Sequence, residues 1–341
     1  MVNSPIMDFR LKLEIELQDK SGDRKGITIA DAYADPTKGL DMSAHIVKTD
    51  DNKPNASRLT IYNLSTEIYN LIYEQANAFR LSCARGENAD YVAFYTGFPV
   101  RANKNAKDTV QTSNKGFMAQ DANAGRAGQN DLETVITLMN YGIAKLYKSY
   151  QTEVNANLVL QDCMNALGLP KGNIDTNIQE RLDNVFYSAG FTIRGNVSDT
   201  LNLIGNQCGF KWNTNDMKLN IYDQYRGDIK AYGIKLTPEN SSTPERLDDR
   251  FKAREKSIQN INANANVTVT KQINGVKGNI PNKPMQGFKI RTGLLPHLQC
   301  GSTAVLEDFN MTGAEGNKYI YRIEHTVNNT GLDAYTDVYC V

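Results

Sequence analysis

The chain has 341 residues, which is longer than one typical domain and predicts two or three. Hydrophobic residues make up 40% and charged residues 22%, a balance that excludes disorder throughout because enough apolar surface is available to build cores. Basic and acidic residues both number 38, and a net charge of zero argues against a dedicated nucleic-acid-binding protein.

The first third of the chain predicts β-strands and one helix. From Phe9 to Leu17 apolar and charged residues alternate, which is typical of a strand with one buried and one wet face. Ser65 is a good N-cap for a short amphipathic helix that follows a strand directly. Further strands are expected at 27–29, 44–48, 57–62, 81–84, 91–95, 132–139 and 143–147.

Residues 103–130 differ from everything before them. They are rich in Asn, Lys, Ala, Gln and Gly and contain few large apolar side chains. A segment of this composition cannot bury enough surface to fold alone. We therefore expect a long exposed loop or a partly disordered insertion that becomes ordered on assembly.

From about residue 150 the pattern becomes helical. One helix covers 158–167 and ends at Gly168, and a second begins at the N-cap Ser198 and ends at Gly209. Directly after it, 210–212 and 218–222 flank a polar turn and predict a hairpin. This part therefore predicts a small α+β region.

The last third is β-rich. Residues 237–284 are polar and weakly patterned, and only 266–271 alternate well enough to predict a strand. In 319–327, every second residue from Tyr319 to Val327 is expected on one buried face. Other strands are expected at 287–291, 303–307 and 334–341. The whole outline predicts a mainly β (α+β) fold: β-rich, small α+β, then β-rich.

Motifs for chemistry are scarce. The sequence has no phosphate-binding loop, no nucleophile elbow and no HExxH motif, and only three histidines, His45, His297 and His325. A zinc site could be drawn from His297, Cys300, His325 and Cys340, but only one pair is closely spaced. We favour His297 in a loop, His325 packed on the β face, and the two cysteines as small apolar groups. The sequence therefore predicts no metal site, no cofactor and no catalytic residue.

Acidic pairs and tyrosines leave two other functions open. The pairs Asp248–Asp249 and Glu307–Asp308 could serve a glycosidase, yet both lie in turn-like contexts where carboxylates are usually solvated. The 17 tyrosines suit a glycan-binding surface, a protein interface or an ordinary β protein. The alternatives are thus a cell-wall-degrading enzyme and a glycan-binding module.

The cysteines and the hydropathy pattern bear on location. Five cysteines lie far apart without a CxxC pair, so neither a disulfide framework nor a cysteine-rich zinc module is expected. We expect folding in a reducing cytoplasm, no signal peptide, and no membrane insertion, since no run of 18 apolar residues occurs.

Three segments together resemble one family. The first is ASRLTIYNLSTEIYNLI (56–72), a strand that runs into a short helix. The second is FTIRGNVSDTLNLIGNQCGFKWNTNDMKLNIYD (191–223), with a capped helix and a hairpin. The third is GLLPHLQCGSTAVLEDF (293–309) with YIYRIEHTVNNTGLDAYTDVYCV (319–341). Their order resembles that of the central hub proteins of phage tail baseplates, the double-barrel family of contractile-tailed phages.

The resemblance implies two tail-tube-like β-barrels and a structural, non-enzymatic role. It implies an N-terminal barrel domain at 1–150 that carries the loop at 103–130, a small α+β domain at 151–225, and a C-terminal barrel domain at 226–341. It also implies a homotrimeric ring in the virion baseplate, made in the host bacterial cytoplasm, that adapts a sixfold tail tube to a threefold central spike. The implied partners are the tube protein, the spike protein, other baseplate proteins and the tape-measure protein, with DNA only passing through the lumen during genome ejection.

Overall fold

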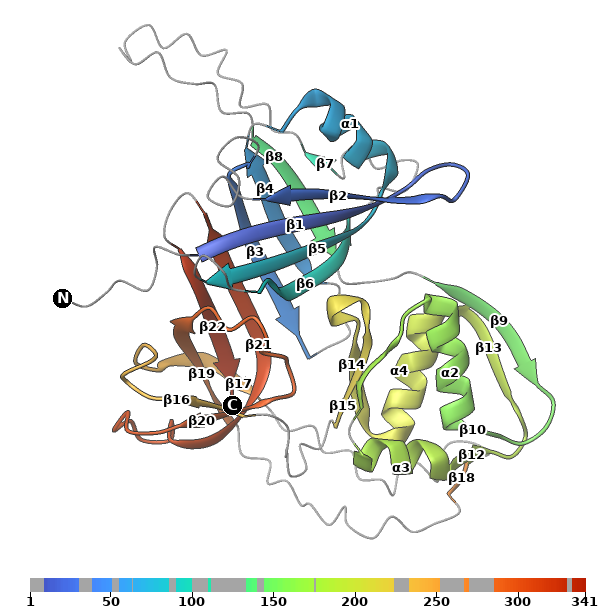
Figure 1. The fold of residues 1–341 in the computed structure, drawn as a ribbon. Helices are drawn as coiled ribbons and strands as arrows, with labels where there is room; N and C mark the ends of the chain where they lie inside the picture. Colours follow the sequence, from blue (N-terminus) through green and yellow to red (C-terminus); the bar gives the residue numbers. More distant parts are fainter. Residues whose placement is uncertain are drawn as a thin grey trace, which may run out of the picture.

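The computed structural model of the chain divides into three units, two β-rich and one α+β (Figure 1). It describes residues 9–30, 39–50, 55–62, 64–85, 90–99, 110–111, 133–139, 144–174, 176–223, 233–251, 267–269, 285–329 and 333–341. No helix within these ranges is long and apolar enough to cross a membrane.

The N-terminal unit is a curved antiparallel sheet with one helix beside it (Figure 1). In β1 the predicted alternation is confirmed, since Leu11, Leu13 and Ile15 are buried and the intervening charges are half-buried. The elements are β1 (Phe9–Gln18), β2 (Arg24–Ala30), β3 (Met42–Thr49), β4 (Ala56–Tyr62), α1 (Thr66–Gln75), β5 (Ala76–Arg85), β6 (Val92–Pro99), β7 (Val110–Gln111) and β8 (Glu133–Met139).

The predicted cap of α1 is confirmed. The Oγ of Ser65 accepts a hydrogen bond from the amide of Ile68 at 3.3 Å, which satisfies a donor that the first turn leaves without a partner. Apart from β7, which pairs with β8, the predicted loop at 103–130 lies outside the described residues.

The middle unit packs three helices against short strands (Figure 1). The predicted hairpin is confirmed as β14 paired with β15. The elements are β9 (Lys145–Tyr150), β10 (Val154–Asn155), α2 (Ala156–Leu167), β11 (Lys171–Ile174), α3 (Thr176–Asn184), β12 (Val185–Tyr187), β13 (Phe191–Asn196), α4 (Val197–Cys208), β14 (Phe210–Asn213), the 3-10 turn η1 (Asn215–Met217), β15 (Leu219–Asp223) and β18 (Val267–Val269).

Two predictions for the middle unit need correction. The N-cap of α4 is Asn196 and not Ser198, because Val197 is fully buried and its amide already donates to the carbonyl of Ala144. The sequence also gave no sign of α3, whose only buried apolar residues are Ile178 and Leu182.

The C-terminal unit is built of strands that pair antiparallel, except that β16 pairs parallel with β20 (Figure 1). A register shift at Tyr321 corrects the predicted face of β21: Ile323, His325 and Val327 are buried, but Tyr321 is only half-buried and lies against Tyr339. The elements are β16 (Ile234–Leu236), β17 (Glu245–Phe251), β19 (Met285–Gly293), β20 (Thr303–Leu306), β21 (Gly316–Asn328) and β22 (Ala334–Cys340).

One sheet runs through both β-rich units. Strand β3 pairs antiparallel with β21, with Ile46 opposite His325. Eleven strands of this sheet follow the order β17-β19-β22-β21-β3-β4-β8-β6-β5-β1-β2, and β7, β16 and β20 pair beside this path. Figure 1 shows β3 reaching down from the N-terminal unit beside β21. The two β-rich units are therefore joined by backbone hydrogen bonds as well as by side chains.

Each unit has its own apolar core, and the mainly β fold with a small α+β unit in the middle is confirmed. Some elements lie across the expected domain limits. Strand β9 precedes residue 151 yet pairs with β13, and β18 follows residue 226 yet pairs with β12. The ranges 1–150, 151–225 and 226–341 stay a proposal.

The end of α2 gives a first test. Gly168 has a left-handed backbone with φ of 65°, and a Cβ there would meet no atom within 4 Å. The variant Gly168→Ala is expected to lose about 1 kcal/mol of unfolding free energy, purely from backbone strain. Denaturant titration measures it. Gly26→Ala, where φ is not left-handed and the space is equally open, is the control, and equal losses in both variants would contradict the explanation.

Candidate functional site at the junction of the three units

The groups considered for zinc are not arranged as a metal site. His297 is exposed in a turn, whereas Cys300, His325 and Cys340 are buried in or beside the C-terminal sheet. Burial raises the pKa of Cys340 to about 12, which disfavours the thiolate that zinc requires. No group of three or more His, Cys, Asp or Glu in the described part of the chain could hold a metal ion.

The two carboxylate pairs considered for a glycosidase lie in different parts of the C-terminal unit. Asp248 and Asp249 lie within β17 at an irregularity of its pairing with β19, which corrects the expected turn. Glu307 forms an ion pair with Lys235 at 2.6 Å, and Asp308 follows it with a left-handed backbone, φ 62°. Glu307 is thus held by a lysine.

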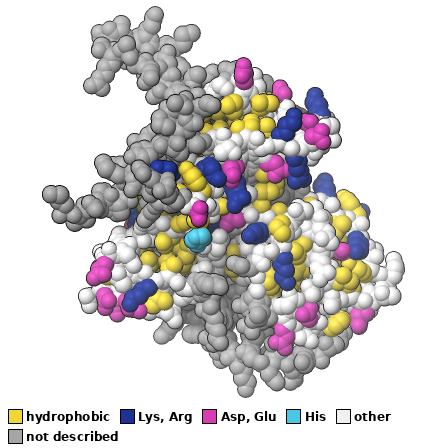
Figure 2. Space-filling view, in the orientation of Figure 1, with side chains coloured by type: hydrophobic (Ala, Val, Ile, Leu, Met, Phe, Trp, Pro, Cys, Tyr) yellow, Lys and Arg dark blue, Asp and Glu magenta, His cyan; other side chains and the backbone are white. Residues whose placement is uncertain are grey.

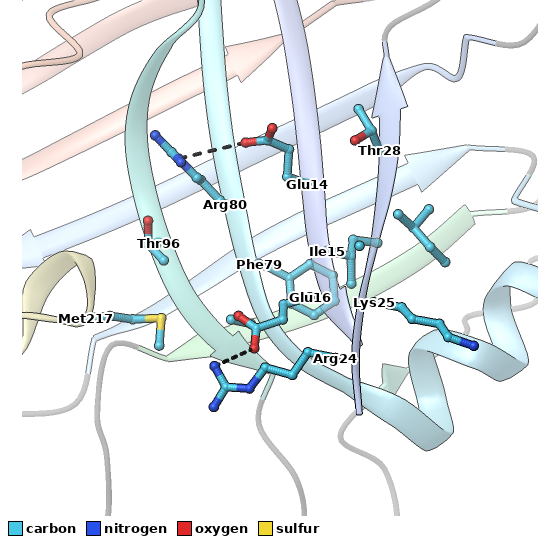
Figure 3. Close-up of a pocket in the computed structure, with 13 residues that line it drawn as sticks. Glu14, Ile15, Glu16, Arg24, Lys25, Thr28, Phe79, Arg80, Thr96 and Met217 are labelled. Carbon is cyan, nitrogen blue, oxygen red and sulfur yellow. Dashed lines mark ion pairs between the residues drawn. The ribbon is translucent and has the colours of Figure 1, made fainter. Parts of the chain in front are cut away.

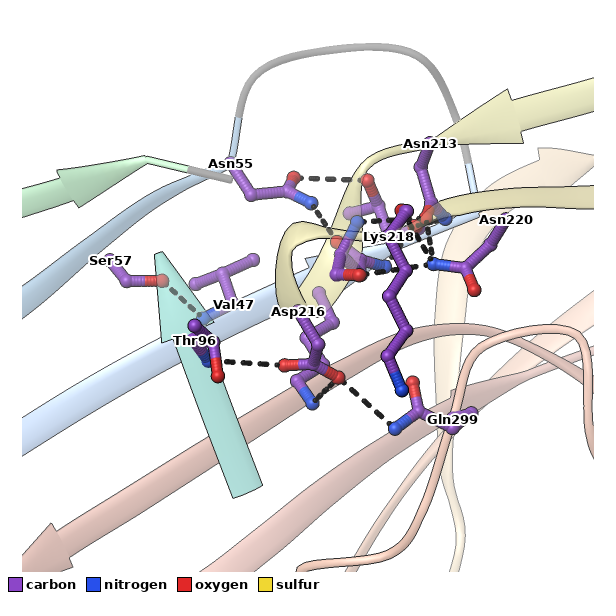
Figure 4. A network of polar contacts seen from close by, with 12 residues as sticks. Val47, Asn55, Ser57, Thr96, Asn213, Asp216, Lys218, Asn220 and Gln299 are labelled. Atoms are coloured by element: carbon purple, nitrogen blue, oxygen red, sulfur yellow. Dashed lines mark hydrogen bonds and ion pairs between the residues drawn. The ribbon is translucent and has the colours of Figure 1, made fainter. Parts of the chain in front are cut away.

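The most distinctive polar site is the junction of the three units, centred on Asp216 in η1 (Figure 4). One carboxylate oxygen of Asp216 accepts from the Lys48 ammonium at 2.7 Å and from the Gln299 amide at 3.1 Å. The other accepts from the backbone amide of Thr96 at 3.4 Å. One carboxylate of the middle unit thus contacts both β-rich units.

Lys48 makes this junction costly to break. Its side chain is fully buried, while that of Asp216 is 21% exposed. An ammonium without a counter-ion in such an interior would cost several kcal/mol, so Asp216 compensates a charge that water cannot reach. Asp216 itself has a left-handed backbone, with φ of 57°.

Asparagine side chains extend the junction around the hairpin turn (Figure 4). Asn55 donates to the side-chain oxygen of Asn215 at 3.2 Å, and Asn215 donates to the carbonyl of Thr49 at 2.9 Å. Asn220 donates to the side-chain oxygen of Asn213 at 3.1 Å. These bonds fix the turn against the end of β3, because every contact has a defined direction.

Asp50 forms a second contact among the three units. Its Oδ2 accepts from the Lys211 ammonium of the middle unit at 3.2 Å and from the Tyr319 hydroxyl of the C-terminal unit at 2.8 Å. Burial, and next the charge of Asp50, raise the pKa of Tyr319 well above its usual value, so this hydroxyl stays a hydrogen-bond donor. The junction therefore repeats one arrangement: a single carboxylate contacts two other units.

A buried histidine lies on the strand that joins the sheets. His325 is fully buried, its Nδ1 lies 3.0 Å from the Thr336 hydroxyl, and its ring meets Phe94 edge-on at 5.9 Å. Burial first, and the Lys48 charge second, hold the pKa of His325 well below its usual value. His325 is thus neutral in the folded protein at neutral pH.

A hollow of about 510 Å³ lies next to the junction, on the N-terminal unit (Figure 3). Residues of β1, β2 and β5 form its wall, and Met217 of η1 reaches its rim. Along the wall Glu16 pairs with Arg24 at 3.1 Å and Glu14 with Arg80 at 3.8 Å. Since opposite charges already neutralise one another there, nothing in the hollow singles out a ligand.

Sequence reasoning missed the junction. One signal was available for Lys48, which stands at an inward position of β3 in phase with Met42, Ala44 and Ile46. A lysine on the buried face of a strand indicates a buried partner. Asp216 carried no such signal, because it lies in a polar turn where aspartate is common.

The fold is that of phage-type tail proteins, which confirms the expected resemblance at the level of the fold. The chain is similar to the prophage MuSo2 43 kDa tail protein from Shewanella oneidensis, at 10% identity and a TM-score of 0.50, over 98% of this chain and 96% of that one. It is similar to the tail protein from Neisseria meningitidis MC58, at 9% identity and a TM-score of 0.50, over 98% and 96%.

A structure of a Francisella protein complex has a similar fold. The Francisella PdpA-VgrG complex in its half-lidded form matches at 12% identity and a TM-score of 0.53, over 97% of this chain. This chain spans 57% of the length of that one. No family model and no curated protein matches the sequence.

The ion pair at the junction predicts an asymmetry between its two partners. Asp216→Asn is expected to lose about 3 kcal/mol of unfolding free energy, because it leaves the buried Lys48 uncompensated. Lys48→Met is expected to cost less, since Asp216 is partly exposed and keeps Gln299 and Thr96 as donors. The double variant should recover part of the loss, as denaturant titration can measure.

The exposed pair Lys235–Glu307 provides the control for this experiment. Lys235→Met is expected to change the unfolding free energy by less than about 1 kcal/mol. If Lys48→Met were as harmful as Asp216→Asn, the buried ammonium would not be the source of the cost.

His325 predicts a pH dependence. Its folded pKa lies below the unfolded value near 6.5, so the unfolded chain binds the extra proton and stability falls as pH drops below about 6.5, by up to about 1.4 kcal/mol per pH unit. His325→Gln should flatten this part of the stability curve. His45→Gln, at an exposed histidine whose Nδ1 also lies against a threonine hydroxyl, should leave the slope as it is. An unchanged slope in His325→Gln would refute the assignment.

Proposed function

We propose that the chain is a structural component of a phage-type tail, the central hub of its baseplate. The observation that carries the proposal is the likeness of fold to two tail proteins over 98% of this chain, both β-rich units and the middle unit included. The proposed location is the tail baseplate of the virion, after synthesis in the host cytoplasm.

The proposed assembly is a homotrimeric ring. Each chain contributes two β-rich units joined through β3 and β21, so three chains would present six such units around a channel. A ring of this kind adapts a threefold spike on one side to a sixfold tail tube on the other. The proposed partners are the tube protein, the spike protein, further baseplate proteins and the tape-measure protein, with DNA passing through the lumen.

The proposed function is non-enzymatic. It lies in shape, in the ring interface and in the lumen, so no residue is assigned a role in turnover. Support comes from where three described carboxylates are placed: Asp216 and Asp50 bind lysines and other donors that join the units, and Glu307 is paired with Lys235 at the surface.

The oligomeric state tests the proposal. Light scattering of the purified chain should give three times the chain mass of 38.0 kDa, and averaged particle images should show a threefold ring with a central channel. A monomer at every concentration, with no ring in the images, would contradict the hub.

Activity assays separate the hub from its alternatives. Purified peptidoglycan should remain intact when the protein is added. Lysis that disappears in the variant Glu307→Gln with Asp308→Asn would favour a cell-wall-degrading enzyme. Glycan binding by a monomer would favour a glycan-binding module.

A further inference from the structure

The outer face of the C-terminal sheet combines cations with tyrosines. On the inner face of this sheet lie Phe288, Ile290, Ile323 and Val338, all fully buried. The outer face, which we call the Arg–Tyr face, consists of Lys289, Arg291, Arg322, Tyr335 and Tyr339. In the view of Figure 2, basic and acidic side chains are interspersed over the visible described surface.

The acidic partners of this face are recessed beneath it. The side chain of Asp337 is 5% exposed and accepts from Arg291 Nε at 2.7 Å, Arg291 Nη2 at 3.0 Å and Lys289 Nζ at 3.2 Å. Glu324, 12% exposed, pairs with Arg322 and accepts from the Tyr339 hydroxyl at 3.1 Å. The cations remain accessible, with Arg291 50% and Arg322 42% exposed. On β19, β21 and β22 the charges accessible to solvent are therefore positive, while Glu245 on the neighbouring β17 is an exposed carboxylate opposite Lys289.

Aromatic rings hold the same cations in place. The Arg291 guanidinium lies 3.8 Å from the centre of the Tyr335 ring, and Arg322 lies 5.2 Å from that of Tyr339. Lys289 lies 5.6 Å from the Tyr339 ring on the neighbouring strand. Each cation is fixed by a carboxylate below and a ring beside it, so little side-chain freedom is left to lose on binding.

Stability alone does not account for this arrangement. Burial would raise the pKa of Asp337, yet the hydrogen bonds from Arg291 and Lys289 outweigh burial and hold that pKa below its usual value. A carboxylate that stays charged at this depth has lost its hydration, and its hydrogen-bond partners must replace it. Apolar side chains at the same positions would stabilise the sheet equally well, so stability does not require these charges. Arginine and tyrosine are also the residues most enriched where protein interfaces gain their affinity.

We propose that the Arg–Tyr face is a docking surface for an acidic segment of a protein partner. Carboxylates of the partner would bind the outward N–H groups of Arg291 and Arg322, and its apolar atoms would pack on the edges of Tyr335 and Tyr339. The proposal concerns a surface of the single chain and does not depend on ring formation.

An acidic polypeptide fits this face better than nucleic acid does. Three carboxylates lie in or beside it, namely Asp337, Glu324 and the exposed Glu245, which stands opposite Lys289 on β17. A duplex places phosphates at high density and would meet all three. A peptide can space its carboxylates to match two arginines and fill the gaps with apolar groups.

Fluorescence anisotropy with a labelled oligo-glutamate peptide at low ionic strength tests the proposal. The main variant is Arg291→Gln, which removes the exposed cation and leaves Lys289 to pair with Asp337. A second variant, Arg322→Gln, leaves Glu324 its bond from Tyr339. The Kd is expected to rise about tenfold in each. Arg246→Gln, at an exposed arginine outside the face, is the matched control and should bind as the unchanged chain does.

Each outcome decides the question. Loss of peptide binding in both face variants, with normal unfolding temperatures, supports the docking surface. Equal binding by all variants, or equal losses in Arg246→Gln, overturns it. Tighter binding of a short DNA duplex than of the peptide overturns the choice of partner. Light scattering on the same samples reports the ring separately, so failure of docking and failure of the trimer are distinguishable.

Discussion

The pairing of β3 with β21 is the constraint on which the rest of the structure depends. It makes one sheet of two units, and it turns Lys48 and His325 toward the same interior from neighbouring strands. A slip by one residue would move each inward side chain of β3 to the outer face, so the register is tied to the burial of that lysine. The junction with the middle unit can form only where this register places the Lys48 ammonium, 2.7 Å from Asp216.

Polar bonds and one apolar side chain set the position of the middle unit. Most of its core is separate from the other two, and its polar contacts with them run through Asp216, Asn215 and Lys211, while Tyr222 of β15 is buried in the C-terminal core. Directional bonds of this kind add less stability than apolar packing would, but they form in only one orientation of the middle unit relative to the other two. The left-handed backbone at Asp216 and Met217 shows that local strain is tolerated to keep that orientation.

Local signals in the sequence predicted the local structure well. The alternation of β1, the Ser65 cap, the end of α2 at Gly168 and the hairpin of β14 and β15 each depend on residues a few positions apart. Helix α3 was missed because two apolar residues make too weak a pattern. Ser198 was predicted as the N-cap in place of Asn196, where the helix begins, because the burial of Val197 comes from tertiary contacts. The junction could not be predicted from the sequence, since Lys48 and Asp216 are 168 positions apart and no motif connects them.

The pairing of β3 with β21 also determines when the chain can complete its fold during synthesis. His45 on β3 and Thr326 on β21 are neighbours in space but 281 positions apart, so almost the whole polypeptide must leave the ribosome before that edge of β3 is covered. Contacts of such high order form slowly, and an uncovered strand edge attracts other chains in the meantime. Completion of the C-terminal sheet is therefore the late step that ends the period of exposure to aggregation, and chains shortened before β21 would keep that edge open.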